Sequence, residues 1–165
     1  MADDKLTYAE ELRRLASGYA ARLRDLPESV VRRRPAPGKW SVAEVIGHLI
    51  DSASNNHQRF IRGRWQDALV FPGYAQDDWV AAQRYQQADW KTLIELWRSF
   101  NLHLADVMER TPAADRKKQY IQHNFDQVAF RSMTADAPAT LDWFMEDYVE
   151  HFKHHLKQID GLLAS

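Results

Sequence analysis

The stretch APGKWSVAEVIGHLIDSASNNHQRFIR, residues 36–62, opens with a break in regular structure and continues as a long amphipathic pattern. Pro37 and Gly38 interrupt any regular element. Ser41 and Glu44 then have the spacing of a capping box, in which the serine accepts a hydrogen bond from a free backbone N–H and the glutamate reaches back. Apolar residues follow at steps of three and four and predict a helix from Ser41 to about residue 65: Val42, Val45, Ile46, Leu49, Ala53 and Phe60.

Three further helices are predicted from the same kind of pattern. The first spans about residues 4–25, and the third spans about residues 90–110 behind an Asp89 N-cap. The fourth begins after Thr140 and ends at Gly161, a glycine suited to a helix C-terminus. Four amphipathic helices with long connections predict an all-α fold, a four-helix bundle.

The two longest connections lack a helical period. LVFPGYAQDDW, residues 69–79, predicts a loop with one short helix from Asp78. Residues 111–139 contain two residue–proline pairs and only weak periodicity. We expect a long connection there, with a short strand pair near Tyr120–Phe130.

Length and composition narrow the class of protein. The chain has 165 residues, 45% of them hydrophobic, and a net charge of -1, which predicts one globular domain over residues 1–165 with no field that attracts nucleic acid. Two short basic runs, Arg32–Arg34 and Arg116–Lys118, are predicted to be solvated loop charges. The absence of cysteine excludes disulfides and thiolate metal sites. A charged N-terminus and the lack of a long apolar run predict a cytoplasmic protein without a membrane partner.

Three of the seven histidines lie close together in EHFKHHLKQ, residues 150–158. On the predicted fourth helix, His151 and His155 are four residues apart and share one edge of the apolar stripe, whereas His154 points away from it. Such a pair either makes ordinary hydrogen bonds at the edge of the core or supplies two nitrogen ligands to one metal ion. The second interpretation needs a third ligand from another segment.

Four histidines are candidates for that third ligand. His57 projects near the apolar stripe of the second helix, and His48 lies on its polar side. His103 lies at the edge of the third helix's stripe, and His123 is in the long connection. The helical wheel does not choose between the four.

The chain resembles the DinB/YfiT family in two distant segments. Residues 36–62 contain a Gly-x-Trp-Ser-Val start followed by His-Leu-x-Asp-Ser, and EDYVEHFKHHLKQI, residues 146–159, is similar to the family's terminal His-x3-His helix. The resemblance covers about Leu26–Ile159, and FPGYAQDDWV between the two segments is similar to the YfiT branch. It implies a DinB-type four-helix bundle with long connections.

The resemblance also implies a metal site. The family's ligands carry over onto His48, His151 and His155, which would hold one divalent transition metal ion, zinc or nickel. Three protein nitrogens leave a coordination position open, as in catalytic rather than structural zinc sites. Asp51 and Asp147 would either orient these imidazoles or be ordinary carboxylates on the helix surface.

The function implied by the resemblance is that of a metal-dependent enzyme acting on a small molecule. The family is described as metal-dependent hydrolases, and relatives of the same fold resemble transferases that use a low-molecular-weight thiol. No residue in the sequence stands out as a general base, so no catalytic residue is assigned. The expected partner is a small-molecule substrate, for which such a thiol is one candidate. A second copy of the chain, in a homodimer, is another candidate partner. The alternative is a non-catalytic metal-binding stress or binding protein of the same fold.

Overall fold

The computed structural model describes residues 7–165, and four long helices dominate it. They are α1 (Thr7–Leu23), α3 (Val42–Gly63), α5 (Trp90–Arg110) and α8 (Leu141–Ala164). These helices confirm the predicted all-α four-helix bundle. Of the predicted first helix, residues 4–6 lie outside the described part of the chain.

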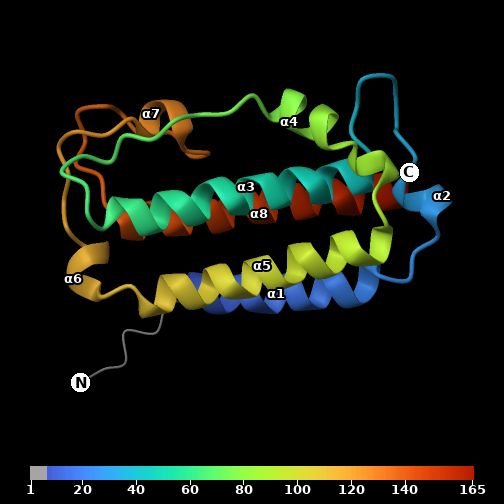
Figure 1. Cartoon of the computed structure of the whole chain (residues 1–165), viewed down its shortest axis with the longest axis horizontal. Coiled ribbons are helices and arrows are strands. Elements are labelled where there is room, and N and C mark those ends of the chain that lie inside the picture. Colours follow the sequence, from blue (N-terminus) through green and yellow to red (C-terminus); the bar gives the residue numbers. More distant parts are fainter. Residues whose placement is uncertain (1–6) are drawn as a thin grey trace.

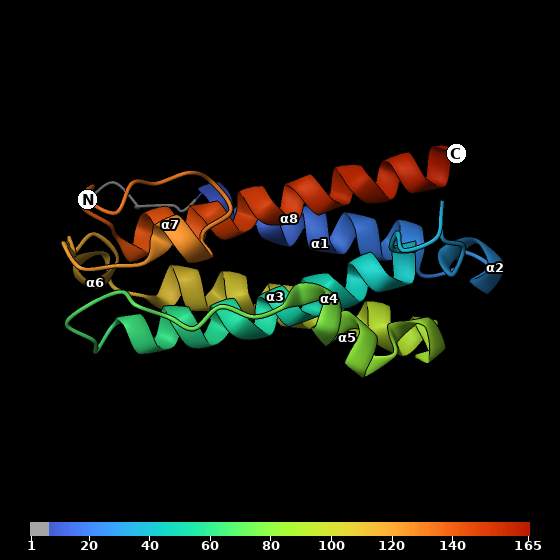
Figure 2. The same ribbon diagram turned by 90° about the horizontal axis from the view of Figure 1, so that it is seen from above.

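The four helices pack as a bundle in which each has two neighbours. α1 contacts α5 and α8, and α3 contacts α5 and α8. Figure 1 shows α1 and α8 running in one direction and α3 and α5 in the other, and Figure 2 shows the same bundle from above. Because the neighbours α3 and α5 run in parallel, the chain between them has to return along the whole bundle. It does so across the outer side of α3 (Figure 1).

Short helices interrupt the connections. They are α2 (Glu28–Val31), α4 (Gln76–Gln83), the 3-10 turn η1 (Tyr85–Gln87), α6 (Ala113–Arg116) and α7 (Phe125–Val128). The short helix predicted from residue 78 is therefore present and begins two residues earlier. In the described part of the chain, no helix is both long enough and apolar enough to cross a bilayer.

The predicted strand pair near Tyr120–Phe130 is wrong. The described residues contain only two isolated bridges, Leu69 with His123 and Tyr120 with Ala139. The side chain of Asn124 exchanges hydrogen bonds with the backbone of Phe71, at 3.0 and 2.8 Å. It therefore takes the backbone groups that a further rung would need, and α7 begins at the next residue.

The predicted end of the fourth helix at Gly161 is also wrong. α8 continues to Ala164, and Gly161 has no positive φ. Leu162 and Leu163 beyond it are partly buried against the core. This burial offsets the roughly 1 kcal/mol by which a glycine disfavours a helix interior.

One residue in each basic run departs from the predicted solvated loop charge, whereas Arg33, Arg34, Lys117 and Lys118 are exposed. Arg32 donates to the backbone oxygens of Gln86 and of Ala88, the latter at 2.8 Å, and so ties the loop before α3 to the one before α5. Arg116 is only 3% exposed and pairs with Asp142 at 2.5 Å. The sequence of a short basic run shows its charge, but it does not show which distant residues will pair with that charge in the folded protein.

The start of α3 is fixed by the predicted capping box. Ser41 Oγ accepts a hydrogen bond from the Glu44 N–H at 3.3 Å, and Glu44 Oε2 accepts one from the Ser41 N–H at 2.9 Å. The guanidinium of Arg34 pairs with the same carboxylate. The two reciprocal hydrogen bonds satisfy backbone N–H groups of the first turn and so fix where α3 begins.

α3 is buried around its whole circumference in its first half. Every residue over 42–53 is buried, including the polar ones. The apolar stripe packs into the bundle, whereas on the polar side His48 meets His151 of α8 and Asp51 accepts a hydrogen bond from Gln83 of α4. A polar stripe on this helix is therefore an interior surface.

Candidate metal centre

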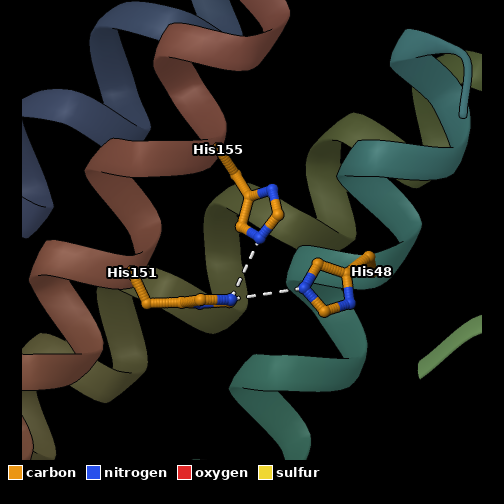
Figure 3. Close-up of side chains that lie close together, drawn as sticks. All are labelled: His48, His151 and His155. Carbon is orange, nitrogen blue, oxygen red and sulfur yellow. Dashed lines mark hydrogen bonds between the residues drawn. The ribbon is translucent and has the colours of Figure 1, made fainter. Parts of the chain in front are cut away.

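Three histidines meet on the polar side of α3. His48 projects from α3, and His151 and His155 project from α8 (Figure 3). Their Nε2 atoms converge, at 3.3 Å between His48 and His151 and 3.0 Å between His155 and His151. In residues 7–165, this is the one group of three or more acidic or histidine side chains whose ligand atoms lie within 4.8 Å of one another.

The spacing of these nitrogens fits a metal ion. Two ligands of a tetrahedral ion at 2.0–2.1 Å are about 3.4 Å apart, close to the observed separations. Three ring nitrogens that face one point cannot all satisfy each other with hydrogen bonds, because a neutral imidazole carries only one proton. An ion at that point would accept all three lone pairs.

Two neighbouring side chains orient the rings. His155 Nδ1 lies 2.8 Å from Gln158 Oε1, so it donates its proton there and leaves Nε2 as a lone pair. His151 Nδ1 lies 3.4 Å from Ser52 Oγ. His48 Nδ1 is buried without a hydrogen-bond partner in the described structure, and the ring packs 4.9 Å from Trp40.

The surroundings keep all three rings neutral. Burial lowers the pKa of His48 to about 3, and the nearby His155 acts in the same direction. Burial likewise lowers the pKa of His151 well below its ordinary value, and it lowers that of His155 against the opposing hydrogen bond to Gln158. Only the neutral imidazole binds a metal, so protons do not compete for these nitrogens at neutral pH.

The three histidines lie in the wall of a cavity of about 480 Å³. This volume is within the range of small-molecule sites. The floor is formed by polar residues of α3 and by residues of α8, and the remaining walls come from the segment before α4 and from α7 with the two residues that follow it. The histidines are therefore accessible to a small molecule, although they are largely buried.

The model of the DinB superfamily matches residues 11–159. The chain belongs to the DinB superfamily. Two curated relatives are both named "Putative metal-dependent hydrolase". The one from Bacillus licheniformis is 23% identical over 74% of this chain and 68% of its own length, and the one from Oceanobacillus iheyensis is 22% identical over 75% and 69%.

A solved structure has the same fold. YfiT from Bacillus subtilis, described as "a probable metal-dependent hydrolase with an unusual four-helix bundle topology", superposes with a TM-score of 0.72. The alignment covers 95% of this chain and 82% of YfiT at 19% identity. This likeness confirms the DinB/YfiT-type bundle that the sequence predicts.

The other four histidines of this DinB-superfamily chain do not belong to the group of converging ligand atoms. His57 packs against His103 and Phe100, at ring separations of 5.4 and 5.8 Å. His123 accepts the Phe125 N–H through Nδ1 and lies 2.7 Å from a backbone oxygen through Nε2, so it is a satisfied histidine of the connection. His154 is exposed on α8, but its ring lies 5.1 Å from that of His155 and lines the same cavity.

Asp51 and Asp147 fit neither predicted role. Both are 2% exposed, so they are not surface carboxylates, and in the described structure neither accepts a hydrogen bond from an imidazole. Asp51 accepts from the Tyr85 hydroxyl and from Gln83, both at 2.6 Å. The polar side chains nearest to the site nitrogens are Ser52, beside His151, and Gln158, beside His155. In the sequence they follow His48 and His155 by four and three residues. That helical spacing is the signal that identifies them.

Asp147 instead anchors the segment that follows α7. Its two oxygens accept the backbone N–H groups of Phe130 and Arg131, each at 2.8 Å, and Arg131 Nε lies 3.1 Å away. The anchored Phe130 ring packs 5.5 Å from His151 and 5.2 Å from His154. Asp147 thus holds one wall of the cavity against the histidines.

Proposed function

We propose that His48, His151 and His155 bind one divalent transition metal ion, zinc or nickel, in an enzyme that acts on a small molecule. The observation that supports this proposal is the convergence of three neutral Nε2 atoms in the wall of an accessible cavity. His48 Nδ1 has no hydrogen-bond partner in the described structure, but Nε2 of the same ring still faces the point where the three nitrogens converge. The names of the two curated relatives, which include the words "metal-dependent", also support a bound metal ion.

The reaction we propose is hydrolysis, with transfer of a low-molecular-weight thiol to an electrophile as the second candidate. An ion held by three imidazoles keeps a coordination position for a water, a thiol or a substrate oxygen, and it lowers the pKa of the water or thiol. The chain itself orients the imidazoles through Ser52 and Gln158 and packs Phe130 against His151. The relatives' names favour hydrolysis.

A non-catalytic metal-binding protein is the alternative, and the cavity separates the two. A storage or structural site needs no space beside its ion, whereas this site opens into about 480 Å³. Turnover of a panel of esters, amides and thiol–electrophile pairs by the zinc- and nickel-loaded protein tests the enzyme proposal. No turnover of any pair, together with stoichiometric metal, would favour the alternative.

Protein purified without a histidine tag is expected to carry about one divalent transition ion per chain. The physical reason is the preformed donor set, which needs no deprotonation at neutral pH. Elemental analysis by mass spectrometry checks the stoichiometry, and stripped protein is then reconstituted with each metal. Protein that takes up neither zinc nor nickel would remove the basis of the proposed function.

Removal of the ion is expected to leave the bundle folded. The core is built from apolar residues of all four long helices, including Trp97, Phe144 and Phe152, and does not depend on the site. Chelated protein should keep its far-UV circular dichroism spectrum and melt at a lower temperature, since an ion that binds only the folded state stabilises it. Loss of helicity on chelation would instead identify a structural site.

A further inference from the structure

Arg59 is a buried arginine without a counter-charge. Only 6% of its surface is exposed, and no carboxylate of the described residues lies within 4 Å of its guanidinium. Its polar contacts are Nη2 to the Pro72 oxygen at 2.9 Å and Nη1 to Asn56 Oδ1 at 3.5 Å. The Phe144 ring lies 5.9 Å from the guanidinium carbon. Arg116, which is buried to a similar extent, has Asp142 as its partner.

The cavity that Arg59 lines has no free negative charge to offer it. Asp147 is the only acidic residue in the lining, and Arg131 with two backbone N–H groups already occupies its oxygens. Burial lowers the pKa of Arg59 from its ordinary value, yet an arginine remains protonated at neutral pH. A buried charge is costly unless it is paired, so an anion that entered the cavity would stabilise this cation.

Arg59 and His48 lie along one stripe of α3. His48, Ser52, Asn56 and Arg59 follow at steps of four, four and three residues, which places them on one face of the helix. Contacts lead from the guanidinium toward the site: Arg59 Nη1 lies 3.5 Å from Asn56 Oδ1, and Asn56 Nδ2 lies 3.3 Å from Ser52 Oγ. Ser52 Oγ in turn lies 3.4 Å from Nδ1 of His151 on α8. All four line the same cavity, so one small molecule can contact the guanidinium and the imidazoles together.

We infer that Arg59 binds a carboxylate of the substrate and holds the opposite end of that molecule at the three histidines. The inference rests on the proposed function and names its substrate class, a small organic acid. The guanidinium presents N–H donors in a planar fork that fits a carboxylate. One unpaired positive charge matches a carboxylate, whereas a phosphate carries a charge of about -1.5 to -2.

The test compares two ligands that differ only in charge. 6-Mercaptohexanoate and 6-mercaptohexanamide each carry a thiol, which binds zinc, and end in either a carboxylate or a neutral amide. In calorimetric titrations of the zinc-loaded protein, we expect the carboxylate to bind about tenfold or more tightly than the amide. Arg59→Gln should abolish this preference. Arg62→Gln is the matched control and should keep it, because Arg62 is exposed on the same helix and contacts only Gln58.

A second measurement separates Arg59 from the ion. Hexanoate and hexanamide are titrated into metal-free, ¹⁵N-labelled protein, and the Arg59 Nε–H resonance is followed after assignment by its loss in Arg59→Lys. Hexanoate should shift this resonance and hexanamide should not. If the protein binds no metal, the proposed function fails, but this titration of the wild-type chain still decides the role of Arg59.

Three results would overturn the inference. The first is a carboxylate preference that persists in Arg59→Gln, which would assign the anion to the ion itself. The second is an Arg59 Nε–H resonance that hexanoate leaves unmoved. The third is a larger shift with hexyl phosphate than with hexanoate, which would assign the site to phosphate.

Discussion

Replacement of His151 by alanine is expected to lower the zinc affinity by roughly two orders of magnitude or more, because it removes one of three nitrogen ligands. His151 has the central position, since its Nε2 lies within 3.3 Å of the Nε2 of both other rings. His48→Ala and His155→Ala should have effects of the same order. Competition with a chromogenic chelator measures each affinity, and circular dichroism checks that each variant is folded.

Two histidines serve as matched controls. His154→Ala removes an exposed ring from α8, the helix that carries His151 and His155. His57→Ala removes a ring of α3 that packs against His103 of α5. Both variants should keep the zinc affinity within a few fold. If His57→Ala abolished binding while His48→Ala left it intact, the proposed ligand set would be incorrect.

Substitution of Gly47 by alanine is expected to destabilise the fold by about 1–3 kcal/mol or more. A Cβ at this position would lie 2.1 Å from the Tyr85 ring, so the ring would have to move. Tyr85 is 6% exposed and donates its hydroxyl proton to the buried Asp51 at 2.6 Å, so a displaced ring would also leave that carboxylate short of a donor. Urea denaturation followed by circular dichroism measures the free energy of unfolding.

Gly161→Ala is the control for this substitution. Gly161 lies within α8, and a Cβ there would meet nothing within 4 Å. Alanine should therefore stabilise the protein by about 0.5–1 kcal/mol through helix propensity. Equal free energies of unfolding for the two variants would contradict the close approach of Tyr85 to α3.

Much of the fold could be predicted because its signals are local. The Ser41–Glu44 capping box and the Asp89 N-cap are formed within four residues, and both are present as predicted. Where the prediction failed, a distant contact decided the structure. The end of α8 depends on core packing of Leu162 and Leu163, and the missing strand pair depends on Asn124, which pairs with the loop at Phe71.

The candidate site was only partly accessible to sequence reasoning. The spacing of His151 and His155 places both on one side of a single helix, which requires no knowledge of the neighbours. The helical wheel placed His48 on a polar side and could not select it, because a wheel detects an apolar face and cannot show that the opposite face is also covered. Resemblance to the family selected it, and the structure brings its ring to the other two.

The candidate metal ligands and much of the cavity wall come from different parts of the chain. The histidines come from two long helices, while much of the wall comes from the connections before α4 and around α7. Connections of this kind tolerate insertion and sequence change far better than packed helices do. If the proposed function holds, changes in these two segments would alter which compounds the cavity accepts without disturbing the helices. Grafting the two segments between related chains should then transfer a preference for one compound over another.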